Sequence, residues 1–194
     1  MLSNLEKYDV VLASGSPRRR ELLSALGLKF RVEVREGISE ALPAGMPVTQ
    51  IAAHLSRVKA EAYKPVDNQL IITADTVVIE GGEVLGKPAD EAEARRMLQR
   101  LSGKVHSVIT GVTVTTRERT QTFSAQTQVE FDELTDEEIT YYIDNYRPMD
   151  KAGAYGIQEW IGCVGVRSIQ GSFYNVMGLP LHRLYTELNT MLND

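Results

Sequence analysis

The stretch "YDVVLASGSPRRREL", residues 8–22, contains an apolar run, a turn of small residues and the start of a helix. Residues 8–13 are mostly apolar and include two β-branched valines, which is typical of a short buried strand. Ser16 is a favourable N-cap, and Pro17 suits the first position of a helix. The order of strand, turn and helix therefore predicts an α/β unit at the start of the chain.

Strand and helix patterns continue to alternate beyond this unit. Residues 29–34 alternate like a strand, and Thr49 is expected to cap a helix whose apolar residues run to Ala62. The apolar segments "LIITA" and "TVVIE" predict central strands, with a hairpin turn at Gly81-Gly82. Further patterns predict a helix from Asp90 to Gly103, followed by a hairpin of 104–116 with 120–131. The capping box "TDEE" predicts a helix through Tyr146, and a strand in "CVGVRSI" and a helix over Leu179–Leu192 complete the chain. The expected fold class is α/β, with a mixed twisted sheet and flanking helices in one domain over residues 1–194.

The composition excludes several classes of function. The net charge is −5, from 21 Lys and Arg against 26 Asp and Glu, so stable binding of nucleic acid through a basic face is not expected. The N-terminus lacks the pattern of a signal peptide, and no apolar stretch reaches the roughly 18–20 residues of a membrane span. The single cysteine, Cys163, allows no disulfide within the chain, so a cytoplasmic location is expected. Because "WIGCVGV" resembles an apolar strand, we expect Cys163 to be a buried thiol and not a nucleophile.

The arginines after the first turn raise the question of an anionic partner. Cations are unfavourable at a helix N-terminus, whereas free backbone N–H groups there bind anions. Arg18 and Arg19 precede Leu22 and Leu23 by one turn, which is compatible with a phosphate site and also with a solvated helix start. Arg20 lies about 200° round the helix from Arg18, so we expect it to be a surface charge.

Several other polar residues lie where they could take part in catalysis or in binding a ligand. Asp75 interrupts the apolar segments in "TADTV", where it could bind a metal, activate water or form a turn between two strands. Lys59, Lys87 and Lys151 each fit a solvated lysine when taken singly. Gln158 ends the glycine-rich loop "DKAGAYGIQ", where it could read a base edge or anchor the loop.

The histidines and the tryptophan give no sign of a reactive centre. His54, His106 and His182 are dispersed and form no metal-ligand pair at helical spacing, so we expect them to be structural or exposed. Trp160 is expected to be a packing residue.

Six motifs in one order resemble the Maf family of nucleoside triphosphate pyrophosphatases: "LASGSPRRREL", "RVKAEAY", "TADTVV", "VLGKP", "LSGKVHSVITGV" and "DKAGAYGIQ". The resemblance covers residues from about Asp9 to Tyr185. It implies two lobes around a cleft, similar to inosine triphosphate pyrophosphatase. It also implies hydrolysis of a nucleoside triphosphate to the monophosphate and pyrophosphate with a divalent cation, Mg²⁺ or Mn²⁺. The resemblance further implies a link to septum formation and division arrest, and a possible homodimer.

The loop "DKAGAYGIQ" resembles the branch of the family that acts on dTTP and UTP, and the branch that acts on 7-methyl-GTP differs there. Thr73 stands where the family more commonly has Gly, and we expect it to be tolerated on a strand. By position, Asp75 matches the proposed proton acceptor. The residues that match specificity determinants are Arg18, Thr76 and Gln158, and those that match other cleft positions are Ser14, Arg19, Glu40, Lys59 and Lys87.

A mechanism follows in physical terms from these matches. Arg18, Arg19, Lys59 and Lys87 would neutralise the triphosphate and the leaving pyrophosphate. Asp75, with Glu40, would bind the metal and activate water, and Ser14 or Ser16 would hold phosphate oxygens. Gln158 has both a donor and an acceptor for the edge of a pyrimidine.

Other functions remain open from the sequence. Non-standard pyrimidine nucleotides are possible substrates of the expected enzyme, and 7-methyl-GTP is an alternative one. The chain could also be a nucleotide-binding regulator of division with little turnover. An RNA-modifying or structural α/β module is a weaker alternative, because the chain is acidic and lacks aromatic RNA-binding motifs.

Overall fold

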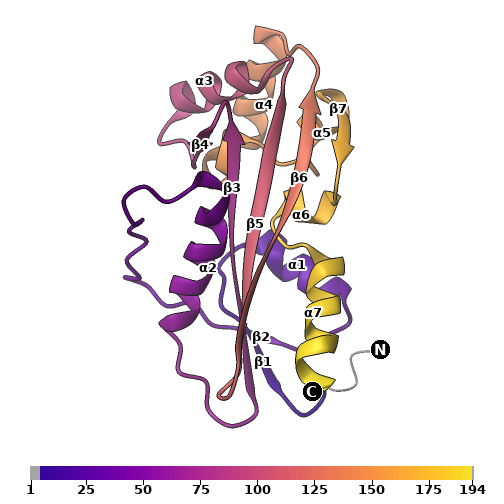
Figure 1. Cartoon of the computed structure of the whole chain (residues 1–194). Coiled ribbons are helices and arrows are strands. Elements are labelled where there is room, and N and C mark those ends of the chain that lie inside the picture. Colours follow the sequence, from indigo (N-terminus) through magenta and orange to yellow (C-terminus); the bar gives the residue numbers. More distant parts are fainter. Residues whose placement is uncertain (1–4, 194) are drawn as a thin grey trace. The chain divides into compact units, whose positions relative to one another are not determined.

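The computed structural model describes residues 5–193 of the chain, with the side chains of residues 5–191. The strands of its sheet are β1 (Asp9–Leu12), β2 (Arg31–Val32), β3 (Gln69–Glu80), β4 (Glu83–Leu85), β5 (Val105–Thr115), β6 (Thr120–Phe131) and β7 (Val166–Gln170). The α-helices are α1 (Pro17–Ala25), α2 (Ile51–Glu61), α3 (Glu91–Leu101), α4 (Asp136–Tyr146), α5 (Trp160–Val164), α6 (Phe173–Met177) and α7 (Leu181–Asn193) (Figure 1). Short 3-10 helices are η2 (Val48–Gln50), η3 (Pro148–Asp150) and η4 (Ala152–Ala154).

The sheet is mixed, as the sequence predicts for an α/β chain. Its order is β2-β1-β3-β5-β6-β7, and β4 pairs with β3 outside this path. β1 pairs in parallel with both β2 and β3, whereas β4 is antiparallel to β3 and β7 is antiparallel to β6. The chain divides into two compact units, and β3, β5 and β6 contribute residues to both.

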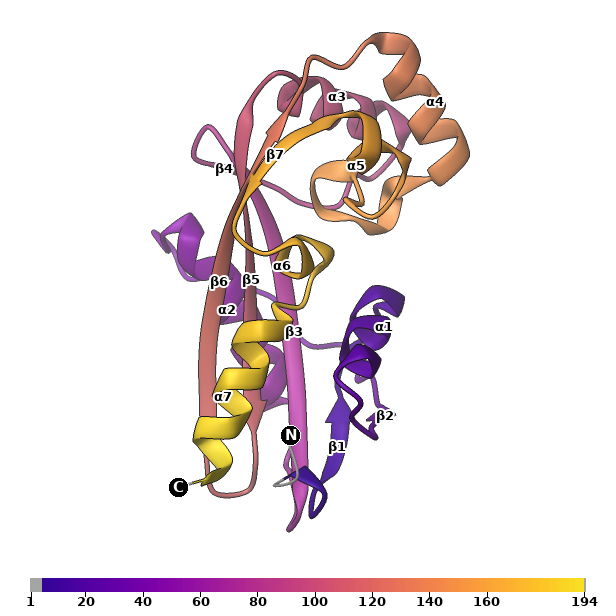
Figure 2. The same cartoon turned by 90° about the vertical axis from the view of Figure 1, so that its right-hand side faces the viewer.

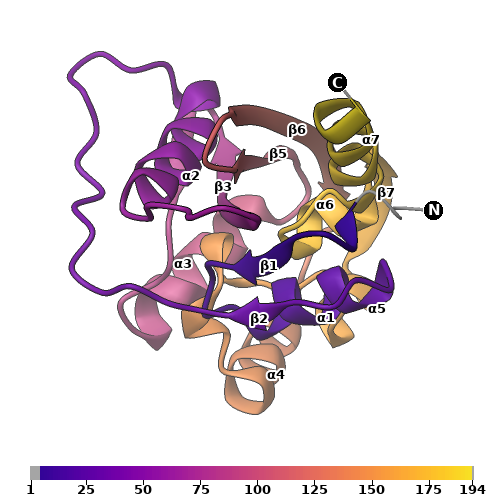
Figure 3. The same cartoon turned by 90° about the horizontal axis from the view of Figure 1, so that it is seen from below.

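The first unit comprises the described residues up to Asp75, Thr110–Ala125 and those from Gly178 on. Its strands β1 and β3 are in register with Val11 opposite Ile71, and both side chains are buried. Leu22 and Leu23 of α1 are buried as well. Figure 3 shows α1 beside β1 and β2, and Figures 1 and 3 show α2 and α7 flanking the strands of this unit.

The second unit comprises Thr76–Ile109 and Gln126–Met177. Helices α3 and α4 pack against each other, as Figure 2 shows. Their buried faces include Leu98 and Leu101 on α3 and Ile139 and Tyr142 on α4. These residues recur every three or four positions, as the buried face of a helix requires, and both helices agree with the predictions made from their capping signals.

The caps of three helices are confirmed. Ser16 accepts a hydrogen bond from the backbone N–H of Arg19, and Pro17 is the first residue of α1. Asp90 caps α3 in the same way, and Thr135 with Glu138 forms a capping box on α4. These side chains satisfy N–H groups that have no partner inside the helix.

Some local predictions are wrong. The segment around Cys163 begins as helix α5, the strand β7 starts only at Val166, and the Cys163 thiol is exposed. Gly162 permits this helix, because a Cβ atom there would lie 1.8 Å from the carbonyl oxygen of Ile157. Thr49 lies within η2 and is not the cap of α2, whose N-cap position is Gln50 without a side-chain hydrogen bond.

Two strands also differ from their predicted lengths. The strand expected over residues 29–34 is only β2, whose two residues are both exposed. The two segments expected around Asp75 form one unbroken strand, β3, so Asp75 is not in a turn. Among the described residues, none of the helices has both the length and the apolar content needed to cross a membrane.

Candidate active site

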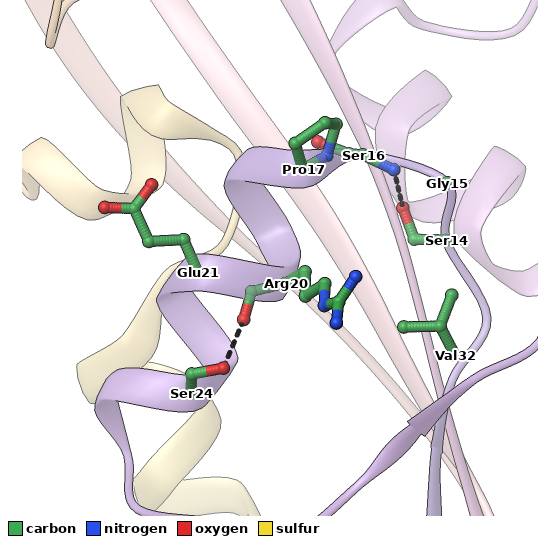
Figure 4. Close-up of a pocket in the computed structure, with 8 residues that line it drawn as sticks. All are labelled: Ser14, Gly15, Ser16, Pro17, Arg20, Glu21, Ser24 and Val32. Atoms are coloured by element: carbon green, nitrogen blue, oxygen red, sulfur yellow. Dashed lines mark hydrogen bonds between the residues drawn. The ribbon is translucent and has the colours of Figure 1, made fainter.

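The turn between β1 and α1 is held by its own serine hydroxyl groups. The N–H of Ser16 donates to Ser14 Oγ at 3.3 Å (Figure 4), and the N–H of Arg19 donates to Ser16 Oγ at 3.4 Å. Ser14 is buried and Ser16 is partly buried. Both predicted phosphate-binding serines therefore shape the helix start that would receive an anion.

Arg19 links this turn to the segment before α7, which is also in the first unit. Its Nε atom donates to the carbonyl oxygen of Gly178 at 2.8 Å, and its Nη1 atom donates to Ser14 Oγ at 3.3 Å. Burial lowers the pKa of Arg19, the nearby carboxylate of Asp75 opposes that effect, and the charge of Arg18 adds to it. The helix start thus brings Arg19 into the electrostatic neighbourhood of Asp75, with the charge of Arg18 beside it.

A lysine between two carboxylates forms the centre of the predicted site in this unit. Lys59, in the last turn of α2, forms an ion pair with Asp75 Oδ1, and its Nζ atom lies 3.1 Å from Glu40 Oε1. The exposed fractions of the side chains are 21% for Lys59, 16% for Asp75 and 50% for Glu40. Residues from a helix, a strand and a loop therefore meet at one ammonium group, and Lys59 is not simply solvated.

The other predicted residues belong to the second unit. Thr76 follows Asp75 on β3 and is partly buried, whereas Lys87 and Gln158 are exposed. The N–H of Gly153 donates to the carbonyl oxygen of Gly86 at 3.0 Å, which joins the glycine-rich loop to the segment that carries Lys87. A Cβ atom on Gly153, whose φ is +68°, would lie 3.1 Å from Val78 of β3. The loop, the segment before α3 and β3 are therefore in close contact.

A buried polar network that the sequence did not predict holds the loop of Gln158. Lys151 is only 7% exposed, and its Nζ atom lies 2.8 Å from Asp150 Oδ1 and 3.1 Å from Glu159 Oε1. The hydroxyl of Tyr142 donates to Glu159 Oε2 and accepts from the N–H of Gly156 at 2.9 Å. Burial, with a smaller contribution from Glu159, raises the pKa of Tyr142, so its hydroxyl remains a donor.

One sequence signal could have revealed part of this network. Tyr142 follows Ile139 by three positions and precedes Ile143, so helical spacing places it on the buried face of α4. A buried tyrosine hydroxyl needs a partner, and Glu159 supplies one. Lys151 is thus a buried ion-pair residue, and the expectation of a solvated lysine is wrong for it.

His106 is buried in the second unit, as a structural histidine. Its Nε2 atom lies 2.7 Å from the hydroxyl of Tyr155, and its ring packs edge-on against Phe131. Burial lowers the pKa of His106 to about 4, which keeps the ring neutral near pH 7. Trp160 is partly buried and packs on Tyr141 with 4.7 Å between the ring centroids, so its packing role is confirmed.

A shallow pocket lies between α1 and β2 (Figure 4). It has a volume of about 470 Å³ and is lined by the serines of the turn, Arg20 and Val32, among others. Arg20 is exposed, as expected, but its side chain also forms one wall of this pocket. Since neither Lys59 nor Asp75 lines it, the pocket is not the centre of the predicted chemistry.

The donors expected for a divalent cation are two carboxylates. Asp75 and Glu40 both approach Lys59 Nζ, so one oxygen atom of each lies beside that ammonium group. Within residues 5–193, no group of three or more His, Cys, Asp or Glu side chains is placed to hold a metal ion. Mg²⁺ commonly uses one or two carboxylates together with substrate phosphates and water, and this pair fits that pattern.

Comparison with known proteins shows that many curated proteins are similar in sequence to this chain. The family model described as Maf-like protein matches residues 9–191. A protein of Phocaeicola vulgatus named dTTP/UTP pyrophosphatase is 56% identical over 98% of this chain and 100% of its own length. One of Porphyromonas gingivalis with the same name is 54% identical over 97% of this chain and 96% of its own length. The Staphylococcus aureus Ham1 structure aligns with 63% of this chain and 71% of its own at 15% identity and a TM-score of 0.44, and this likeness carries no further conclusion.

Proposed function

The chain belongs to the Maf family, and on that premise we propose that it hydrolyses dTTP and UTP to the nucleoside monophosphate and pyrophosphate. The names of its relatives support the reaction and the substrates. The observation within the chain that carries the proposal is the contact of Lys59 with both Asp75 and Glu40. A cation held between two carboxylates suits a reaction in which phosphate charge must be neutralised beside a group that activates water.

The residues of the first unit would serve the triphosphate. Arg19 and Lys59 offer cations near Asp75, Arg18 adds a charge beside Arg19, and guanidinium groups bind phosphate oxygens with two parallel hydrogen bonds. Asp75 would accept a proton from the water that attacks the α-phosphorus. The N–H groups at the start of α1 would bind phosphate oxygens with the aid of the helix dipole.

The residues of the second unit would serve the leaving group and the base. Lys87 is exposed and would bind the leaving pyrophosphate. Gln158 is also exposed, and its amide can both donate to and accept from the edge of uracil or thymine. Thr76, which follows Asp75, is proposed as a further determinant of specificity.

We propose Mg²⁺ or Mn²⁺ as the cofactor, with Asp75 and Glu40 as its protein ligands. The cation would supply positive charge to the triphosphate in the transition state. Lys59 contacts both carboxylates and would share the neutralisation of the phosphate oxygens.

The compartment, the oligomeric state and the cellular role of the activity are proposals drawn from the sequence. We propose the cytoplasm as its compartment, on the basis of the single cysteine. Assembly as a homodimer, removal of non-standard pyrimidine nucleotides and a link to septum formation are further proposals from the family resemblance.

The test is a measurement of pyrophosphate release on a panel of nucleotides with Mg²⁺ or Mn²⁺. We expect dTTP and UTP to be preferred and Asp75→Asn to lower kcat at least about 100-fold, the usual contribution of a general base. Asp67→Asn is the matched control, because Asp67 is 74% exposed and pairs with Arg117. Near-normal turnover by Asp75→Asn would refute the role of that carboxylate. Binding of dTTP without pyrophosphate release would favour a regulator, and a preference for 7-methyl-GTP would favour the other branch.

A further inference from the structure

Two pairs of residues join helix α2 to strand β3 in the first unit. Thr73 and Asp75 are two positions apart on β3, so their side chains point to the same face of the sheet. Ser56 and Lys59 are three positions apart on α2, so they lie one turn apart on one side of the helix. Thr73 bonds to Ser56, and Asp75 bonds to Lys59. The contact proposed for catalysis therefore has a second contact beside it.

The contact made by Thr73 is a buried hydrogen bond. Its Oγ1 atom donates to the carbonyl oxygen of Ser56 at 2.7 Å, and a longer contact of 3.4 Å reaches the carbonyl oxygen of Thr113. Thr73 and Ser56 are both 0% exposed. Since water does not reach this hydroxyl, the protein carbonyl groups supply its acceptors.

The hydroxyl of Ser56 continues the connection to β5. It donates to the carbonyl oxygen of Ala53 at 2.9 Å and lies 2.9 Å from Thr113 Oγ1. Thr113 Oγ1 lies 2.9 Å from Thr122 Oγ1. Each hydroxyl has one proton, so Thr113 donates to Ser56 and Thr122 donates to Thr113. The hydrogen-bonded chain thus runs from β6 through β5 to the backbone of α2.

The distance between α2 and the sheet is fixed by a glycine. A Cβ atom on Gly111 of β5 would lie 2.3 Å from the carbonyl carbon and oxygen of Ala52. Only a residue without a side chain permits this approach of helix backbone to strand. Close packing at Gly111 sets the depth of the helix, and a directional bond is needed to set its position along β3.

We propose that Thr73 is a positioning residue that holds Lys59 against Asp75 through its hydrogen bond to α2. This role rests on the proposed function of Lys59 and Asp75 in pyrophosphate release. Thr73 does not contact the expected substrate, and its hydroxyl acts by fixing where the helix lies. Valine has nearly the same shape but cannot donate, so Thr73→Val removes the bond and fills the same space. Serine retains the donor.

The test compares Thr73→Val with Thr73→Ser in the full chain. Misplacement of a catalytic group affects the chemical step, so Thr73→Val should lower kcat about tenfold or more, with KM within about twofold. Thr73→Ser should restore kcat to within about threefold of the unsubstituted protein. Thr127→Val is the control for lost stability alone, because Thr127 is buried in the second unit and bonds to Ser172. It should lower the melting temperature and leave kcat unchanged.

A second measurement does not depend on turnover. The rate at which an amine-reactive acetylating reagent labels Lys59 is followed by mass spectrometry, with the exposed Lys64 as the internal reference. The ratio of Lys59 to Lys64 labelling should rise at least about threefold in Thr73→Val and remain low in Thr73→Ser, because the ion pair with Asp75 protects Lys59. If Thr73→Val does not fold, Thr73→Ala removes the same donor and answers the same question.

The outcomes separate the two proposals. An unsubstituted protein that releases no pyrophosphate overturns the proposed function, and the labelling ratio still decides the role of Thr73. If the unsubstituted protein is active but kcat and the labelling ratio are unchanged in Thr73→Val, only the role of Thr73 is overturned. A fall in kcat that Thr73→Ser does not restore also counts against the hydrogen bond.

Discussion

The Nε atom of Arg19 donates a hydrogen bond of 2.8 Å to the carbonyl oxygen of Gly178, which lies 159 positions further along the chain. The same guanidinium donates to Ser14, so one side chain connects the first turn with the segment before α7. Lysine cannot make both contacts with the same geometry. Arg19→Lys should therefore lower the free energy of unfolding by about 1.5–3 kcal/mol, measured by urea denaturation. Arg20→Lys, on the exposed side of α1, should change it by less than about 0.5 kcal/mol, and equal effects would contradict the link.

Glu40 provides a test of the cation site that depends little on folding. Its side chain is 50% exposed and pairs with Lys59 from a loop, so Glu40→Gln should cost less than about 1 kcal/mol of stability. If Glu40 is a metal ligand, the Mg²⁺ concentration for half-maximal turnover should rise roughly tenfold, which corresponds to 1.4 kcal/mol of binding energy. Glu36→Gln, an exposed residue of the same loop, is the control. An unchanged Mg²⁺ dependence would remove Glu40 from the metal site.

Gln158 provides a test of base selection. Because its side chain is exposed, Gln158→Ala should leave the urea midpoint unchanged. Loss of one hydrogen bond to the base should lower the ratio of kcat/KM for UTP to that for GTP by roughly tenfold. Gln170→Ala, at the exposed end of β7, should leave that ratio as it is. Equal losses for every nucleotide would indicate a role in turnover and not in base selection.

His106 should make stability depend on pH below neutrality. The pKa of His106 is about 4 in the folded protein, below its ordinary value of 6.5, so the unfolded chain binds more protons between these values. Stability from the neutral ring is present above pH 6.5 and is lost as the pH falls towards 4. The decrease in the free energy of unfolding between pH 7 and pH 4.5 should be about 2 kcal/mol larger in the unsubstituted protein than in His106→Gln. Urea denaturation at both pH values measures it, and the exposed His182→Gln should behave like the unsubstituted protein.

Local patterns account for most of the elements that the sequence predicts. Ser16 with Pro17 and Thr135 with Glu138 act within a few residues of each other, so their cap geometry can be predicted without the rest of the fold. The strand prediction was wrong at "WIGCVGV", where a run of apolar residues is typical of a strand. The deciding contact there is the approach of Gly162 to Ile157, and spacing alone does not reveal it.

The candidate site required long-range information. Asp75 was compatible with a turn because its partner, Lys59, lies on another element, and their ion pair accounts for a carboxylate inside an unbroken strand. Family resemblance supplied Glu40, and the structure places it at 3.1 Å from Lys59. The network of Lys151 and Glu159 was missed because burial of a lysine depends on the whole fold.

Trp160, which packs on Tyr141, is the only tryptophan in the chain and stands two positions after Gln158. The protein therefore has an intrinsic fluorophore next to the loop proposed to meet the base. Emission excited selectively at the indole comes from this one place, without a second tryptophan to dilute it. Titration of a nucleotide against this emission can follow loop rearrangement in the unmodified chain, and rapid mixing can time it against pyrophosphate release.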